Sequence, residues 1–156
     1  MDPKLKAMLD LIGWSEGTST SPLTQNQGYD VIVTGINGPS IFTDYSHHPF
    51  ENGGMVTVRA VPLLQSTAAG RYQLLARYWR VYKAQLELKD YSPASQDAVA
   101  LRQIEERHAT DLIMAGNVEA AIAACSNIWA SLPGNSYGQG GHSMDTLLAE
   151  YATLLG

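Results

Sequence analysis

The chain has 156 residues, 45% of them hydrophobic and 16% charged, with a formal net charge of −5. This length and composition are typical of one globular domain with a sizeable core, so we expect a single domain over residues 1–156. The acidic balance argues against a nucleic-acid partner, and the lack of a long apolar run argues against stable membrane insertion.

Two features of the sequence bear on the compartment. The chain opens on Met1-Asp2-Pro3-Lys4, which is typical of a helix start and not of a secretory signal. We therefore expect synthesis in a cytoplasm, with an export route that the chain does not encode. The only cysteine, Cys125, lies among alanines, so we expect a buried apolar residue and no internal disulfide.

The first predicted helix runs from an Asp2 cap, with Pro3 at the first helical position, to about Glu16. Its apolar stripe at helical spacing consists of Leu5, Met8, Leu9 and Ile12. Glu16 continues that stripe, so its carboxyl is expected to lose hydration and to have a raised pKa. A raised pKa suits a general acid near neutral pH. The alternative is a helix-end glutamate that points into water.

A small antiparallel sheet is expected next, over residues 29–61. A polar loop at 17–28 precedes three predicted strands at 29–34, 41–45 and 55–60. The run Asn37-Gly38-Pro39 indicates a turn between the first two strands.

The rest of the chain is predicted to be helical. Helices are expected over 71–88, from Pro93 onward, over 110–115, from an Asn117 cap to about 131, and from a Ser143 cap to 155. Helix, small sheet and several helices together predict an α+β fold with a sheet lobe, a mainly helical lobe and a cleft between them.

Two segments are suited to a polar, uncharged ligand. One is a small-residue loop that runs from Ser66 into Tyr72 and Gln73, and the other contains Tyr137 and Gln139. Glutamine offers a donor and an acceptor, and tyrosine offers a stacking face and a hydroxyl, which suits sugars with hydroxyl and acetamido groups. The alternative is that these glutamines are ordinary surface residues and these tyrosines half-buried core residues.

Other site chemistries find little support. His47 and His48 are adjacent, His108 and His142 are isolated, and no His-Glu-x-x-His run is present. No Gly-x-Ser-x-Gly elbow, phosphate loop or dinucleotide fingerprint appears either, so we expect neither a metal nor a cofactor.

A glycosidase normally uses two carboxylates. Asp30, Asp44 and Glu51 are candidate partners for Glu16, and the sequence does not choose among them. A mechanism with one carboxylate is open if the acetamido group of the substrate assists.

These residues also carry a resemblance to a known family. The chain resembles the lambda-type phage endolysins, which are lytic transglycosylases, in the same order over nearly its whole length. The matching segments are Trp14-Ser15-Glu16-Gly17-Thr18, residues 28–33, residues 42–46, residues 69–75, residues 95–101, residues 125–134 and Tyr137-Gly138-Gln139.

The resemblance implies a lysozyme-like fold with Glu16 as the single catalytic residue. Such enzymes cleave the β-1,4 bond between N-acetylmuramic acid and N-acetylglucosamine and leave a 1,6-anhydro ring. It also implies that Gln73 of the Tyr72-Gln73 motif faces sugar and that Tyr137 and Gln139 lie in the loop opposite. Residues 35–40 and 46–57 depart from the family pattern, which leaves subsite preference open.

The expected partner is therefore the glycan strand of peptidoglycan, bound by a monomer. The resemblance implies accumulation in the host cytoplasm, release by a separate holin and action in the periplasm. Two alternatives are a hydrolytic lysozyme that pairs Glu16 with Asp30 or Asp44, and a glycan-binding module without catalysis.

Overall fold

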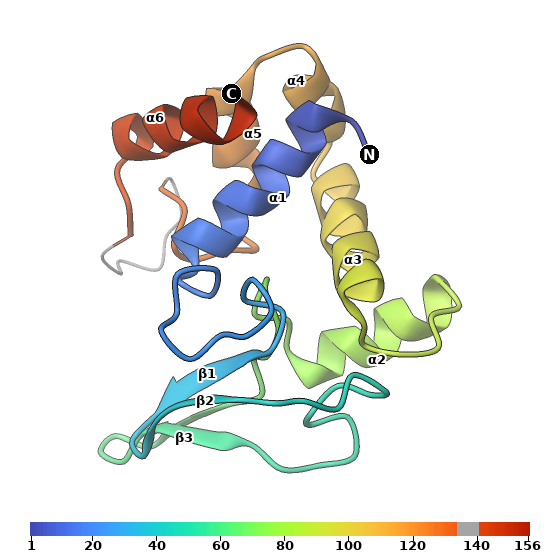
Figure 1. Ribbon diagram of the computed structural model, residues 1–156, viewed down its shortest axis with the longest axis vertical. Coiled ribbons are helices and arrows are strands. Elements are labelled where there is room, and N and C mark those ends of the chain that lie inside the picture. Colours follow the sequence, from blue (N-terminus) through green and yellow to red (C-terminus); the bar gives the residue numbers. More distant parts are fainter. Residues whose placement is uncertain (134–140) are drawn as a thin grey trace. The chain divides into compact units, whose positions relative to one another are not determined.

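The computed structural model describes residues 1–133 and 141–156, and the chain divides into two compact units (Figure 1). The first unit comprises residues 1–16 and 100–156, and the second comprises residues 17–99. Glu16, the predicted acid, is the last residue of the first unit before the chain enters the second unit at Gly17. The predicted single domain and the predicted cleft between its lobes stay predictions.

The first unit is helical. Its helices are α1 (Pro3–Ser15), the last part of α3 (Pro93–Glu106), α4 (Thr110–Met114), α5 (Val118–Cys125) and α6 (Met144–Leu155). α1 packs against α4 and α6, and its Met8, Leu11 and Ile12 are fully buried. Burial of such side chains, at roughly 25 cal/mol per Å² of apolar surface, is the main favourable contribution to folding of this unit.

Three helix N-caps were predicted in the first unit, at Asp2, Asn117 and Ser143. The Asp2 carboxylate accepts the Lys4 N–H at 2.8 Å, and the Ser143 hydroxyl accepts the Thr146 N–H at 3.2 Å, so both caps are confirmed. Asn117 occupies the N-cap position of α5, but its side chain makes no capping hydrogen bond. α5 also ends at Cys125 and not near 131, and the Ser126 hydroxyl donates back to Ala123 O there.

The second unit contains two hairpins where the sequence predicted one sheet. β1 (Val31–Gly35) pairs antiparallel with β2 (Gly38–Ile41), and β3 (Val56–Arg59) pairs with β4 (Leu64–Ser66). The second strand was predicted at 41–45, but it begins at Gly38 and includes Pro39. A two-stranded sheet has only edge strands, which tolerate a proline that lacks an N–H. The strand β4 was not predicted.

The segment before α2 differs most from its prediction. α2 spans Ala76–Gln85, whereas the sequence predicted a helix from 71 to 88. Ala69 instead forms antiparallel bridges with Ile32 and with Leu74, so residues 69–74 extend the β1 region. A hydrophobic core cluster of this unit includes Leu74 of that segment, together with Trp79, Tyr91 and Val99.

Within the described residues, no helix combines the length and the apolar character that a membrane span needs. Cys125 is free and fully buried, as predicted, and burial raises the pKa of its thiol to about 11.

Candidate active site

Glu16 lies at the C-cap of α1, where its N–H donates to Ile12 O at 2.8 Å. Its side chain is partly buried. Burial raises the pKa of the Glu16 carboxyl, and a hydrogen bond from the Ser131 hydroxyl opposes part of that rise. The predicted direction of the pKa shift is therefore confirmed. The role of Glu16 as an acid stays a prediction.

The turn that follows Glu16 is fixed by buried contacts of the second unit. Thr18 is 2% exposed, and its hydroxyl donates to Arg71 O at 2.6 Å. Gly28 lies directly against the Thr18-Ser19 backbone. Thr18, two residues after Glu16, is thus held in place by a buried hydrogen bond, and this limits the backbone conformations open to the turn.

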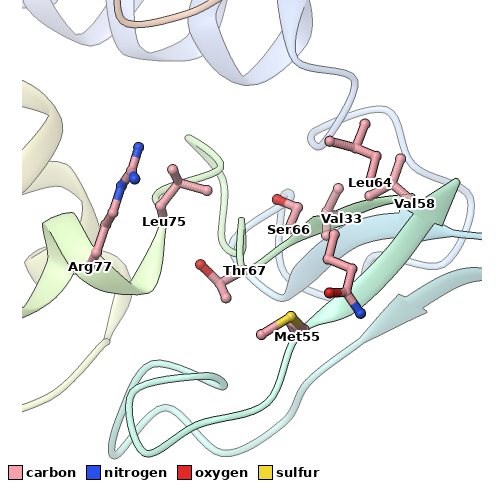
Figure 2. A pocket seen from close by; sticks show the side chains of 9 residues that line it. Val33, Met55, Val58, Leu64, Ser66, Thr67, Leu75 and Arg77 are labelled. Carbon is pink, nitrogen blue, oxygen red and sulfur yellow. The ribbon is translucent and has the colours of Figure 1, made fainter. Parts of the chain in front are cut away.

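Ser66, predicted to contact substrate, lies in a pocket of about 500 Å³ in the second unit (Figure 2). The pocket is lined by Val33, Met55, Val58, Leu64, Gln65, Ser66, Thr67, Leu75 and Arg77. Figure 2 shows Leu75 and Arg77 on one side and Val33, Val58 and Leu64 on the other. Ser66 and Thr67 lie between these two groups. The Ser66 hydroxyl accepts the Ala68 N–H at 3.1 Å, so its orientation is set by its own turn.

Tyr72 is buried, with 5% of its surface exposed. Its hydroxyl donates to Asp97 at 2.6 Å, and burial raises its pKa well above the usual range. A direct contact between Tyr72 and sugar stays a prediction, and this burial speaks against it.

Tyr72 belongs to a cluster that the sequence did not predict. The Tyr29 hydroxyl also donates to Asp97, at 2.8 Å, and the Arg71 guanidinium lies over both tyrosine rings, 5.2 and 5.8 Å from their centroids. Arg71 Nε donates to Gln27 O at 3.0 Å. Tyr29 and Asp97 are 68 residues apart, so no local pattern in the sequence indicates the contact.

Gln73, the other residue of the motif, is partly buried and has a positive φ of 51°. Its side-chain Nε2 donates to Gly70 O at 2.9 Å and to Val31 O at 3.2 Å. The amide therefore ties the Gly70 turn to β1. Its predicted contact with sugar is not tested, and Tyr137 and Gln139 lie outside the described residues.

Each of the three candidate partner carboxylates accepts hydrogen bonds from the protein itself. Asp30 is 3% exposed and accepts the Thr24 hydroxyl and the Gln25 N–H. Hydrogen bonds from the Ser46 hydroxyl and N–H lower the pKa of Asp44. Burial raises the pKa of Glu51, but hydrogen bonds from its partners outweigh burial and lower it overall. Those partners are Trp79 and Lys83.

The His48 ring also has partners within the second unit. His48 is fully buried, with Nε2 at 2.8 Å from Leu74 O and Nδ1 at 3.1 Å from Phe50 N. These contacts require a neutral ring, and burial lowers the pKa of His48. Across residues 1–133 and 141–156, no three His, Cys, Asp or Glu side chains form a group that could hold a metal ion.

Comparison with known proteins gives the family of the chain. A family model described as Endolysin matches residues 6–156. The endolysin of Escherichia phage P2 is 53% identical over 150 residues, which are 96% of this chain and 91% of the relative. The endolysin of Escherichia phage lambda is 55% identical over 147 residues, which are 94% of this chain and 87% of the relative.

Solved structures give the same result for the fold. Bacteriophage lambda lysozyme complexed with a chitohexasaccharide matches with a TM-score of 0.90 and 52% identity, over 100% of this chain and 96% of that chain. A second structure of lysozyme from bacteriophage lambda matches with a TM-score of 0.86 and 50% identity, over 99% and 95% of the two chains. The predicted lysozyme-like α+β fold is confirmed, and the chain belongs to the endolysin family, together with the endolysins of phages lambda and P2.

Proposed function

We propose that this endolysin is a lytic transglycosylase that cleaves the β-1,4 bond between N-acetylmuramic acid and N-acetylglucosamine in peptidoglycan. The observation that carries the proposal is the partly buried Glu16 carboxyl with its raised pKa. A glycan substrate is supported by the chitohexasaccharide bound to the related lambda lysozyme.

In the proposed reaction, Glu16 does both proton transfers. The protonated carboxyl donates its proton to the glycosidic oxygen as the bond to the muramyl anomeric carbon breaks. The muramyl acetamido group stabilises the positive charge that develops at this carbon. The Glu16 carboxylate then takes the proton of the 6-hydroxyl of the muramyl sugar, while the oxygen of that hydroxyl bonds to the anomeric carbon. The 1,6-anhydro ring therefore forms without water, and Glu16 is protonated again.

The surroundings of the other carboxylates support a mechanism with one acid. A second carboxylate would have to reach a water or the sugar itself. Asp30 is 3% exposed and already accepts two hydrogen bonds, which suits a structural role. Asp44 is exposed, but its carboxylate accepts the Ser46 N–H at 2.9 Å and caps its own turn.

Mass spectrometry of the released muropeptides tests the proposal. We expect products from purified peptidoglycan that lack a reducing end and are lighter by one water than the lysozyme products of the same strands. Reducing products would mean that water attacks the anomeric carbon, and the chain would then be a hydrolytic lysozyme. A digest of the same peptidoglycan with a hydrolytic lysozyme provides the reference masses.

The aspartates give a second, independent prediction. Asp30→Asn places an amide NH₂ where two donors now meet the carboxylate, so we expect a loss of about 2 kcal/mol in the free energy of unfolding. We expect Asp44→Asn to keep both the stability and the rate of peptidoglycan clearance. Urea unfolding and a turbidity assay measure the two quantities. A fall of about 10²-fold or more in kcat for a folded Asp44→Asn protein would assign a catalytic role to Asp44.

The setting of the reaction is part of the same proposal. We propose a monomer that accumulates in the host cytoplasm, is released by a separate holin and acts on glycan strands in the periplasm. The family membership supports a role in host lysis.

A further inference from the structure

Ser131 lies in the turn region between α5 and α6, and its hydroxyl contacts the end of α1. The Ser15 hydroxyl donates to Ser131 Oγ at 2.8 Å, and Ser131 Oγ is hydrogen-bonded to the Glu16 carboxyl. A serine hydroxyl carries one proton and two lone pairs. Because Ser131 Oγ accepts from Ser15, its own proton is directed to Glu16.

The backbone carbonyl of Ser131 also makes contacts that hold it in place. Ser131 O accepts the His142 N–H at 3.2 Å, and the Ser15 hydroxyl lies 3.4 Å from the same oxygen. A Cβ added at Gly141 would lie 2.6 Å from Ser131 O, so the returning chain packs directly on this carbonyl. The His142 ring in turn stacks on Trp14, with centroids 4.6 Å apart. These contacts fix Ser131 relative to the last turn of α1.

No charged side chain of the described residues contributes to the Glu16 pKa shift, which arises from burial and from the Ser131 hydrogen bond. The titratable side chains on α1, on the elements packed against it and just before α6 are Lys4, Lys6, Asp10, Asp111, His142, Asp145, Glu150 and Tyr151. The Ser131 hydroxyl therefore opposes the effect of burial on the acidity of Glu16.

We propose that Ser131 is a positioning residue for Glu16: the Ser15 hydroxyl orients the Ser131 hydroxyl, which donates to the carboxylate and holds it in one orientation. This inference rests on the proposed role of Glu16. The contact favours the ionised form of Glu16, which exists between the two proton transfers of the proposed reaction. It also limits how far burial raises the pKa, so that the resting acid still gives up its proton.

The direct test is the titration of Glu16 by carboxyl-carbon NMR, with the resonance assigned by its loss in Glu16→Gln. We expect Ser131→Ala to raise the Glu16 pKa by about one unit, which is the size expected when a hydrogen bond to a charged group is lost. Ser131→Thr keeps the hydroxyl and is expected to retain the native value. Ser15→Ala should shift the pKa in the same direction by less. Ser126→Ala removes a buried serine of the same unit, bonded to Ala123 O, and should cause no shift.

The pH profile of kcat/KM tests the consequence for catalysis. Glu16 must be protonated at the start, so activity falls as pH rises through its pKa, and Ser131→Ala should move this basic limb upward by the same amount. An unchanged Glu16 titration in a folded Ser131→Ala protein would overturn the inference. A shifted titration with an unmoved basic limb would support the contact and would instead overturn the acid role of Glu16.

Discussion

Glu16→Gln is expected to lower kcat on peptidoglycan by at least about 10³-fold, because the amide can neither donate the proton to the glycosidic oxygen nor take one from the 6-hydroxyl. The proposed reaction uses this single group twice, so the loss affects both bond breaking and ring closure. Glutamine has nearly the shape of glutamate, and its Oε1 can still accept from the Ser131 hydroxyl. The turbidity of a peptidoglycan suspension reports the rate.

Binding separates loss of chemistry from loss of structure. We expect the Glu16→Gln protein to bind a chito-oligosaccharide with a Kd within a few-fold of the native value, as measured by calorimetry. Glu105→Gln is the matched control, because it makes the same chemical change at an exposed glutamate of α3. If the Glu16→Gln protein clears peptidoglycan at the native rate, another residue is the acid and the proposed mechanism fails.

The parts of the fold that were predicted correctly depend on contacts close in sequence. Asp2 and Ser143 cap their helices through N–H groups two and three residues away, and the apolar spacing of α1 needs only its own residues. The position of Glu16 at the end of that helix follows from the same local pattern, and so does the raised pKa, because a side chain on the buried stripe loses hydration.

The parts that were predicted wrongly depend on distant partners. Residues 71–75 have helical spacing, yet Leu74 pairs with Ala69. Gln73 has a left-handed backbone, and its side-chain amide donates to Gly70 O and Val31 O. The pairing of Leu74 with Ala69 and the side-chain hydrogen bonds of Gln73 therefore outweigh the helical preference of this segment. The short strand β4 is defined by its register with β3, which no pattern of three residues can indicate.

In the candidate site, too, the features that the sequence did not predict depend on residues far apart in the chain. Ser66 lies in a pocket, but the Tyr72 hydroxyl is bonded to Asp97, 25 residues away, and the sequence alone did not indicate that contact. Ser131 lies 116 residues from Ser15, and serine is too common a residue to stand out in a sequence. A contact such as that between Ser131 and Ser15 is found only from coordinates, whereas Glu16 is proposed as the acid from the pattern of its own helix.

The second large effect is expected at Gly28, which has a φ of +91°. A Cβ there would lie 2.7 Å from Ser19 N and from the Thr18 carbonyl carbon, and both are backbone atoms that cannot rotate away. We expect Gly28→Ala to lower the free energy of unfolding by about 3 kcal/mol or more, which combines the strain of a positive φ with overpacking. For a chain of this length, that corresponds to a fall in Tm of about 6–12 °C.

Gly38→Ala separates the two causes, because Gly38 has nearly the same φ, +92°, but no atom lies within 4 Å of its added Cβ. Strain alone should cost about 1–2 kcal/mol there. Equal losses for the two variants in urea unfolding would show that crowding against Thr18 contributes nothing. A larger loss at Gly28 has a consequence for the site, since the crowded backbone begins two residues after Glu16. In that case the surviving folded fraction of Gly28→Ala should also show a reduced kcat, whereas Gly38→Ala should keep the native value.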